Sequence, residues 1–282
     1  EVQKIKQIPW FDIPKHRTNN EILSEFKERS LPAIKAQISN LFFGRLYYGL
    51  ESSGIGTVYV QLTDANLCNI ISSHDLPISP NVLREIVDTV TRLLGERFRY
   101  TPNIYDLTGA NNNRPMRFTD LPRKHPVRRY LDKCANLHRI PVVNARRKED
   151  CHNPLGEAVA ICLTNSGNPN FFINCDTLVI RRAAEDGVIY QCPHCKKNHL
   201  HLSGGICSGC YRPLNKPNKI ALKKVWDSNY LLVNQVENRK PLRLHCEELT
   251  GQTDNQAERQ RHFRDFIIAE NVRDEELLKR VK

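Results

Sequence analysis

Residues 190–214 read YQCPHCKKNHLHLSGGICSGCYRPL, and this stretch holds two Cys-x-x-Cys pairs. The pairs are Cys192 with Cys195 and Cys207 with Cys210, and eleven residues separate them. Each pair can present two thiolates to a metal ion at about 2.3 Å, so that two pairs complete a tetrahedron. Four soft thiolates leave no open ligand position, which favours a closed, structural Zn²⁺ site. The spacing therefore predicts a zinc ribbon.

Other uses of the four cysteines fit this stretch less well. A redox Cys-x-x-Cys pair needs a thioredoxin-like βαβ context, which the flanking sequence lacks. An iron–sulfur cluster could use four cysteines, but the doubled two-residue spacing favours zinc. His199 and His201 are badly spaced against the two pairs, so we expect them to pack on the ribbon or to hydrogen-bond a ligand sulfur. Gly204 and Gly205 would let the hairpin reverse direction, and Gly209 would allow a tight turn between two ligands.

A closed four-thiolate site supplies folding free energy to a unit too small for a core of its own. It offers no ligand position for a catalytic water, so we expect the metal to stabilise the chain and not to catalyse. Basic side chains surround the site and could touch phosphate or another domain. They are Lys196, Lys197, Arg212, Lys216 and Lys219.

The formal net charge of +11 is concentrated between residues 111 and 150, where eleven basic residues stand against four acidic ones. Such a stretch suits a polyphosphate partner, because each neutralised phosphate releases a counterion. A solvated surface is the alternative interpretation. We expect DNA as the partner. The candidate nucleic-acid contacts are Arg123, Lys124, Arg128, Arg129, Arg146, Arg147, Lys148, Lys196 and Lys197.

Hydrophobic periodicity predicts helices mixed with short strands, and therefore an α+β fold. Gly95 is expected to end the most amphipathic helix as its C-cap, and the Asn-rich residues 103–115 are expected to form a loop and a domain boundary. The expected elements before that loop are two helices within residues 20–50, a strand at 57–62 and a helix at 80–94.

Residues 119–189 are expected to form a basic, winged-helix-like unit. Helices at 126–137 and 155–163 precede strands at 171–174 and 178–180, and helices followed by a small β-ribbon suit such a module. Many small α+β units would give the same pattern. On the helix at 126–137 the basic residues Arg128, Arg129 and Lys133 are expected to point outward.

Six further cysteines are isolated and are expected to be small buried hydrophobic residues, namely Cys68, Cys134, Cys151, Cys162, Cys175 and Cys246. The absence of a signal sequence favours metal or free thiols over disulfides and predicts a cytoplasmic protein. No apolar run approaches the about 20 residues that a membrane span needs, so we expect no membrane partner. Because residue 1 is Glu and the only methionine is Met116, we expect the chain to be a segment of a larger protein.

Motifs for catalysis are missing from these 282 residues. There is no Gly-x-x-x-x-Gly-Lys-Ser/Thr loop, no DEAD/DEAH-like acidic pair and no Gly-x-Ser-x-Gly elbow. The glycines at Ser53–Gly56 have no Lys placed to hold phosphates. A nuclease built from distant carboxylates has no paired-acid motif in its favour. We therefore expect no catalytic residues.

The C-terminal part carries a resemblance to a known family. Residues 242–253, LRLHCEELTGQT, and 258–266, ERQRHFRDF, resemble the region before motif V in the second RecA-like domain of superfamily-2 helicases. They look most like the large DEAD/DEAH-type helicases of bacterial anti-phage systems such as DISARM and Druantia. In that group a cysteine ribbon with His-Leu-His and Gly-x-Cys-x-x-Cys, as at residues 192–210 here, also lies upstream.

The resemblance implies a partial RecA-like α/β end, with ATP and Mg²⁺ bound only by the parent protein. Partners would be other domains of that helicase or subunits of the defence system. His245, Arg259 and Arg261 become candidates for a surface near nucleic acid, although a salt-bridged helix face or a capped turn explains them equally. The expected organisation is a mixed α+β segment (1–118), a winged-helix-like unit (119–189), a zinc ribbon (190–216) and the start of the second RecA-like domain (217–282).

Two functions follow from these patterns. The first is a zinc-stabilised, DNA-contacting part of an ATP-dependent helicase in anti-phage defence, and it predicts salt-sensitive DNA binding without ATPase activity of the segment itself. The second is a non-catalytic zinc-ribbon adaptor that docks protein partners, and it predicts partner binding that is insensitive to salt.

Overall fold

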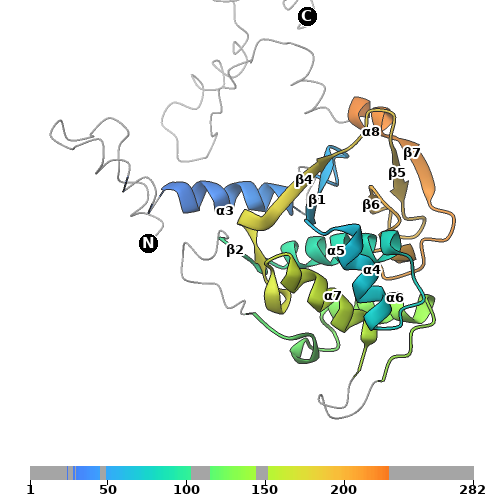
Figure 1. The fold of residues 1–282 in the computed structure, drawn as a ribbon. Coiled ribbons are helices and arrows are strands. Elements are labelled where there is room, and N and C mark those ends of the chain that lie inside the picture. The colour runs from blue at the N-terminus through green and yellow to red at the C-terminus, as the bar shows by residue number, and fades with distance from the viewer. Residues whose placement is uncertain are drawn as a thin grey trace, which may run out of the picture. The chain divides into compact units, whose positions relative to one another are not determined.

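The computed structural model describes residues 24, 28, 30–44, 49–102, 115–143 and 152–228, which mix helices with three small sheets (Figure 1). The helices are α3 (Leu31–Phe42), α4 (Asp64–Ser73), α5 (Pro80–Gly95), α6 (Pro126–Leu137), α7 (Pro154–Asn165) and α8 (Leu222–Ser228). The strands are β1 (Gly56–Val60), β2 (Tyr100–Thr101), β3 (Ile173–Asn174), β4 (Leu178–Arg182), β5 (Val188–Gln191), β6 (Asn198–His199) and β7 (Asn218–Ala221). Short 3₁₀ turns are η3 (Phe118–Asp120), η4 (Pro169–Phe171), η5 (Cys175–Thr177) and η6 (Ser203–Gly205). The predicted mixture of helices and strands is confirmed.

Helix α5 is the central element of the fold, and the prediction of a helix at 80–94 is confirmed. Ser79 begins it, because its Oγ accepts from the N–H of Val82 at 3.4 Å, and Pro80 fits the first turn, where no N–H is needed. Apolar side chains at helical spacing are almost completely buried, namely Leu83, Ile86, Val87, Val90, Leu93 and Leu94. Through them α5 contacts α4, α6, α7 and β1.

Gly95 is the last residue of α5, and the C-cap is Glu96, so the predicted capping role of Gly95 is wrong. A Cβ at Gly95 would clash with the ring of Phe43. That ring in turn lies 5.1 Å from the ring of Tyr100, centroid to centroid. The glycine therefore allows an aromatic side chain to pack against the helix backbone.

One hydrophobic core joins the helices on both sides of the predicted boundary at residues 118 and 119. Helices α6 and α7 form where they were expected, and Asn153 caps α7 by accepting from the N–H of Gly156 at 3.1 Å. The buried side chains of both helices share a core that extends from Phe43 to Ile206. That boundary does not divide the core, because α5 on one side packs directly against α6 and α7 on the other.

The two strands expected to form the ribbon of a winged-helix-like unit pair with earlier strands instead of with each other. Strand β4 lies antiparallel to β1, with Ile180 opposite Val58, and β3 lies parallel to β2, with Ile173 opposite Tyr100. The expected ribbon is therefore wrong. Ile173 and Tyr100 are both fully buried, and their burial brings together segments that are distant in the sequence.

The third sheet has the order β6-β5-β7, and it lies in the region where a zinc ribbon was predicted. Strand β5 pairs antiparallel with β6, where Tyr190 faces His199, and with β7, where Ile189 faces Ile220. The predicted boundary between residues 216 and 217 therefore excludes a strand of this sheet. Helix α8 follows β7 directly, and Trp226 Nε1 donates to the carbonyl of Gly54 at 3.1 Å.

The isolated cysteines differ in their surroundings. Cys134 and Cys162 are fully buried, as predicted, and Cys175 packs half-buried against the core. Cys68 is exposed, so its predicted burial is wrong. It follows Leu67 on α4, and a step of one residue turns a side chain about 100° around a helix, away from the buried face.

Several predicted features lie outside the described residues. They are most of the first helix within 20–50, the loop at 103–114, the contacts Arg146, Arg147 and Lys148, the cysteines Cys151 and Cys246, and residues 229–282, which include His245, Arg259 and Arg261. In the ranges that the structure describes, no helix is long and apolar enough to cross a membrane.

Candidate metal centre

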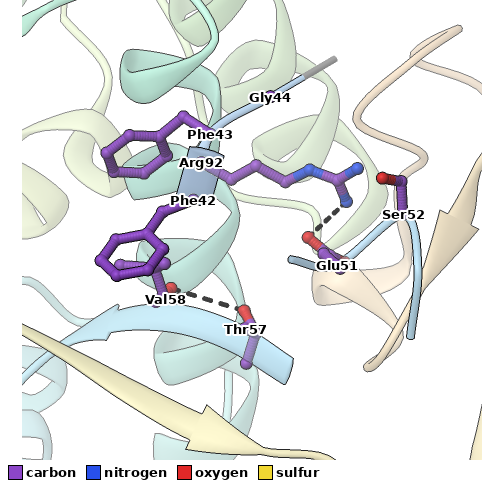
Figure 2. A pocket seen from close by; sticks show the side chains of 8 residues that line it. All are labelled: Phe42, Phe43, Gly44, Glu51, Ser52, Thr57, Val58 and Arg92. Carbon is purple, nitrogen blue, oxygen red and sulfur yellow. Dashed lines mark hydrogen bonds and ion pairs between the residues drawn. The ribbon is translucent and has the colours of Figure 1, made fainter. Parts of the chain in front are cut away.

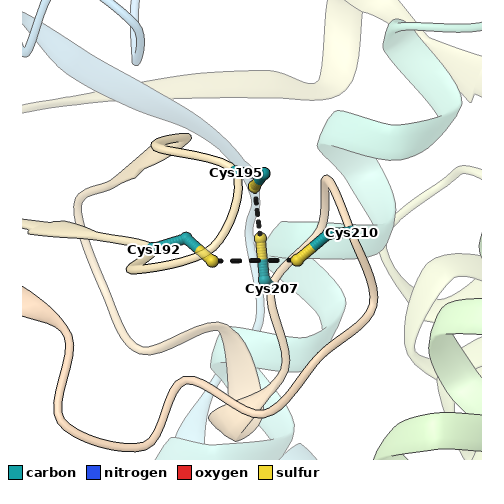
Figure 3. A group of neighbouring side chains, drawn as sticks. All are labelled: Cys192, Cys195, Cys207 and Cys210. Atoms are coloured by element: carbon teal, nitrogen blue, oxygen red, sulfur yellow. Dashed lines mark hydrogen bonds between the residues drawn. The ribbon is translucent and has the colours of Figure 1, made fainter.

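The four predicted ligands come together, and Figure 3 shows their sulfur atoms facing one common point. All four sulfurs lie within 4.8 Å of one another. Cys192 Sγ is 3.7 Å from Cys210 Sγ, and Cys195 Sγ is 3.5 Å from Cys207 Sγ. A tetrahedron with metal–sulfur bonds of about 2.3 Å has sulfur–sulfur edges of about 3.8 Å. A disulfide would need about 2.05 Å. The geometry fits four thiolates around one ion.

The first pair of cysteines sits in a tight backbone loop. The carbonyl of Cys192 accepts from the N–H of Lys196 at 3.0 Å, and the N–H of Cys192 donates to the carbonyl of Lys197 at 2.9 Å. These two bonds close the loop around the first two sulfurs. Strand β5 leads into it and β6 leads out of it.

The second pair repeats the same pattern. The carbonyl of Cys207 accepts from the N–H of Tyr211 at 3.0 Å, and the N–H of Cys207 donates to the carbonyl of Arg212 at 2.9 Å. The residue four positions after the first cysteine has a left-handed backbone in both loops, with φ of +62° at Lys196 and +60° at Tyr211. The two loops therefore repeat the same backbone hydrogen bonds and the same left-handed residue.

Glycines serve the centre in two ways. Gly204 and Gly205 have φ of +59° and +85°, which confirms that they reverse the chain, and a Cβ at Gly204 would clash with Ile86 on α5. At Gly209 the φ is not left-handed, and a Cβ there would lie 3.0 Å from Lys197 Cδ and 3.2 Å from a ligand sulfur. Gly209 is therefore needed because the two loops pack closely there, and not because the turn requires a left-handed backbone.

The electrostatics of the thiols depend on burial and on backbone N–H groups. Burial raises the pKa of Cys207 and of Cys210. For Cys192 burial also raises the pKa, but the backbone N–H groups of Cys195 and His194 outweigh it and bring the pKa to about 7. Coordination to a cation deprotonates a thiol outright. The four cysteines could therefore hold a soft metal ion such as zinc.

The two neighbouring histidines are not part of the sulfur group, in agreement with the prediction. His199 Nε2 lies 3.4 Å from Cys207 Sγ, so the expected hydrogen bond to a ligand sulfur is confirmed for this residue. Burial, together with the nearby charges of Arg92 and Lys197, lowers the pKa of His199 to about 2, so its imidazole is neutral. His201 Nδ1 instead accepts from the N–H of Ser203 at 3.0 Å.

Charged side chains attach the ribbon to α5 and to the loop before β1. Lys197 Nζ lies 2.7 Å from Glu96 Oε1, and Arg92 bridges Glu96 at 3.1 Å and Glu51 at 2.5 Å. Figure 2 shows Arg92 reaching Glu51 at the edge of a small hollow. Glu51 also accepts from the N–H of Leu200 at 3.3 Å. Lys197, a predicted nucleic-acid contact, is therefore engaged within the protein, and its side chain is 21% exposed.

A second set of polar contacts holds η6 on the helices. Tyr130 on α6 donates its hydroxyl to the carbonyl of Ser203 at 2.7 Å. The N–H of Gly204 donates to Glu85 on α5 at 3.0 Å, and His138 Nε2 donates to the carbonyl of Gly204 at 2.9 Å. Sequence reasoning missed these partners, because Tyr130 and Glu85 are separated from their contacts in η6 by 73 and 119 residues.

Arg128 does not point outward, and that part of the prediction is wrong. It is 4% exposed, its Nη1 donates to the carbonyl of Leu121 at 3.0 Å, and its guanidinium lies 5.7 Å from the ring centroid of Phe118. Phe118 lies in η3 and Leu121 is its C-cap, so this turn contributes to the burial of the Arg128 side chain. In this structure Arg128 supports the fold and is not accessible to a phosphate.

Other predicted contacts are accessible. Arg129 is exposed, and its guanidinium stacks over the ring of Tyr211 at 4.5 Å from the centroid. Arg123 and Lys124, before α6, and Lys196, in the first cysteine loop, are also exposed. Tyr211 was missed by the sequence reasoning, although an aromatic residue directly after a ligand and among cations was a usable signal.

Comparisons of the chain with protein-family models, with curated proteins and with solved structures gave no match.

Proposed function

We propose that the described unit is a zinc-stabilised module that contacts nucleic acid, with DNA as the preferred partner. The metal would supply folding free energy to the ribbon. It would not catalyse, because four thiolates leave it no open position for a water or a substrate. The observation that carries the proposal is the stack of Arg129 on Tyr211. It joins the basic face of α6 to the second cysteine loop, so the metal centre fixes the position of a basic surface.

The cations around this stack share a surface suited to phosphates. Lys133 is exposed and lies one helical turn after Arg129, so both project from the same side of α6. Arg123 and Lys124 precede the helix. A guanidinium stacked on an aromatic ring keeps its charge and its N–H donors at the rim available to a phosphate.

Salt dependence of DNA binding tests this surface. The triple variant Arg123→Ala/Lys124→Ala/Lys133→Ala should bind a fluorescein-labelled DNA duplex more weakly in anisotropy titrations. The plot of log Kobs against log salt concentration should become shallower by about 2–3, because each lost phosphate contact on duplex DNA removes about 0.9 from the slope.

A matched control removes three exposed lysines elsewhere. Lys219→Ala/Lys223→Ala/Lys224→Ala changes the net charge equally, and these residues lie on β7 and α8, which Figure 1 shows well separated from α6. Its slope should stay close to that of the unchanged chain. Equal slopes for both triple variants would mean that the protein binds DNA only through its overall charge, and the proposed surface would be wrong.

Arg128 provides a second test, because it is adjacent to Arg129 but buried. Arg128→Leu leaves the carbonyl of Leu121 without its partner, and a buried unsatisfied group costs about 1–3 kcal/mol. Urea unfolding should show that loss while the salt slope for DNA stays unchanged. A shallower salt dependence of DNA binding with an unchanged free energy of unfolding would show instead that Arg128 reaches the DNA.

We further propose that the parent protein is an ATP-dependent helicase or translocase of the superfamily-2 type in anti-phage defence. The support is the resemblance of residues 242–266 and of the ribbon, together with the basic surface described above. On this proposal the chain should bind DNA but show no DNA-stimulated ATP hydrolysis, whereas the parent protein should show it. ATP hydrolysis by the chain alone would contradict the proposal that the ATP-binding part lies elsewhere in the parent protein.

One observation favours the alternative function, a zinc-ribbon adaptor for a protein partner. On α3 the apolar side chains Ile34, Ile38 and Leu41 are 45%, 43% and 57% exposed, and their spacing places them on one stripe. An exposed apolar stripe is typical of a protein contact. The adaptor predicts weak DNA binding with little difference between the two triple variants.

A further inference from the structure

His199 occupies a fully enclosed position beside the candidate metal centre. Its side chain is 0% exposed, and the side chains of Cys207 and Ser203 next to it are 0% and 1% exposed. Both ring nitrogens have partners there. Nε2 lies 3.4 Å from Cys207 Sγ, and Nδ1 lies 3.2 Å from Ser203 Oγ.

The chemistry of a bound thiolate decides where the imidazole proton lies. A metal-bound sulfur carries no proton and can only accept a hydrogen bond, so His199 must donate from Nε2. A neutral imidazole with its proton on Nε2 has an acceptor at Nδ1, and the hydroxyl of Ser203 can donate to it. Both contacts are satisfied by one tautomer.

The position of Ser203 is itself fixed by the helices. Its carbonyl accepts from the buried hydroxyl of Tyr130 at 2.7 Å, and the next residue, Gly204, donates its N–H to Glu85 at 3.0 Å. The backbone of Ser203 is left-handed, with φ of +51°, and its hydroxyl contacts His199 in the ribbon. A continuous line of contacts therefore runs from α6 through Ser203 and His199 to one ligand sulfur.

We propose that His199 is a positioning residue of the metal centre that donates its Nε2–H to Cys207 Sγ and so tightens the binding of the ion. The backbone N–H of Gly209 reaches the same sulfur at 3.3 Å, so Cys207 is held by two donors from different segments. Donors of this kind spread the negative charge of a four-thiolate site and orient the ligand. Their loss typically weakens metal binding about 10- to 100-fold. The inference rests on the metal binding proposed above.

Metal affinity and the cobalt spectrum of the full chain test the role. His199→Phe keeps a ring of similar size and removes the N–H, whereas His199→Gln can place an amide N–H near the position of Nε2. The chains are stripped of metal under reducing conditions and titrated with Zn²⁺ against a chromophoric chelator, and with Co²⁺ by absorption of the sulfur-to-cobalt charge-transfer band. His194→Gln is the control, because His194 is an exposed side chain within the first cysteine loop.

We expect the control to match the unchanged chain, with one Zn²⁺ per molecule. His199→Phe should bind Zn²⁺ about 10- to 100-fold more weakly with a shifted charge-transfer band, and His199→Gln should recover part of both. Ser203→Ala should move both in the same direction as His199→Phe, and it carries the test if His199→Phe does not fold. Unchanged affinity and spectrum in His199→Phe or, where that variant does not fold, in Ser203→Ala would overturn the role of His199 while leaving the metal centre intact. An unchanged chain that binds no metal would refute the metal centre itself and this inference with it.

Discussion

Removal of the metal should destabilise the helical body as well as the ribbon. The perturbation is Cys207→Ser, or a chelator applied to the unchanged chain under reducing conditions. Cys207 is fully buried, and the residue before it, Ile206, belongs to the main hydrophobic core. Without the metal the two cysteine loops lose their common centre, so η6 between them loses its fixed position. The contacts of η6 with α5 and α6 then become free to break.

The size of the effect follows from those contacts. Three hydrogen bonds attach η6, from Tyr130 to Ser203, from Gly204 to Glu85 and from His138 to Gly204. Each contributes about 0.5–1.5 kcal/mol net, so the body should lose about 1.5–4.5 kcal/mol of unfolding free energy. For a unit of about 200 residues each kcal/mol lowers Tm by about 2–4 °C, which gives a fall of about 3–18 °C.

Thermal unfolding followed by far-ultraviolet circular dichroism measures this fall, because most of that signal comes from the helices and little from the ribbon. Elemental analysis should show about one zinc per chain before the change and none after it. Cys68→Ser is the control, since Cys68 is an exposed thiol on α4 outside the sulfur group, and it should change neither value. Zinc lost from the chain with an unchanged Tm of the helices would refute the argument that the metal fixes η6 on them.

Two further predictions concern α5. Gly95→Ala should gain about 1 kcal/mol of stability from helix propensity but lose about 1–3 kcal/mol by crowding Phe43. Urea unfolding should therefore show a net loss of unfolding free energy. A stabilised variant would contradict the close packing of Phe43 on Gly95. Burial raises the pKa of Asp88 to about 7 from 3.8, while Arg181 and Arg84 lower it, so the folded state holds this proton more tightly than the unfolded state. The stability that Asp88 contributes is therefore full below about pH 4 and lost as the pH rises through about 7. Asp88→Asn should remove this fall in stability, which is of the order of a few kcal/mol. Urea unfolding of both chains at about pH 5 and about pH 8.5 measures it. The same pH dependence in both chains would contradict the assignment to Asp88.

Local sequence signals predicted the parts of the fold that local chemistry determines. The amphipathic pattern and the proline at its start located α5, and the same reasoning located α6 and α7. Four cysteines with paired spacing located the candidate metal site, because coordination geometry restricts the spacing of ligands. In each case the deciding residues lie within a few positions of one another or share a strict chemical requirement.

Long-range pairing could not be predicted in this way. Strand β4 finds its partner in β1, more than 100 residues earlier, and nothing in the periodicity of either strand selects the other. The prediction of a winged-helix ribbon was wrong for that reason. The acids that attach the ribbon, Glu51, Glu85 and Glu96, also stand more than 100 residues before their partners in it, and no sequence pattern links them to it.

Arg128 and Arg129 show how far such long-range packing changes the meaning of a charge pattern. Both are basic residues in the first turns of one amphipathic helix, and the sequence assigned them the same outward role. The turn η3 covers Arg128, whereas Arg129 extends toward the second cysteine loop and rests on Tyr211. The basic surface is therefore smaller than the charge count of residues 111–150 suggests, but it is anchored at a residue that directly follows a candidate metal ligand. If the proposed DNA surface is correct, loss of the metal should for that reason weaken DNA binding through Arg129, although none of the four cysteines belongs to that surface, and this coupling separates a metal-organised surface from a merely basic one.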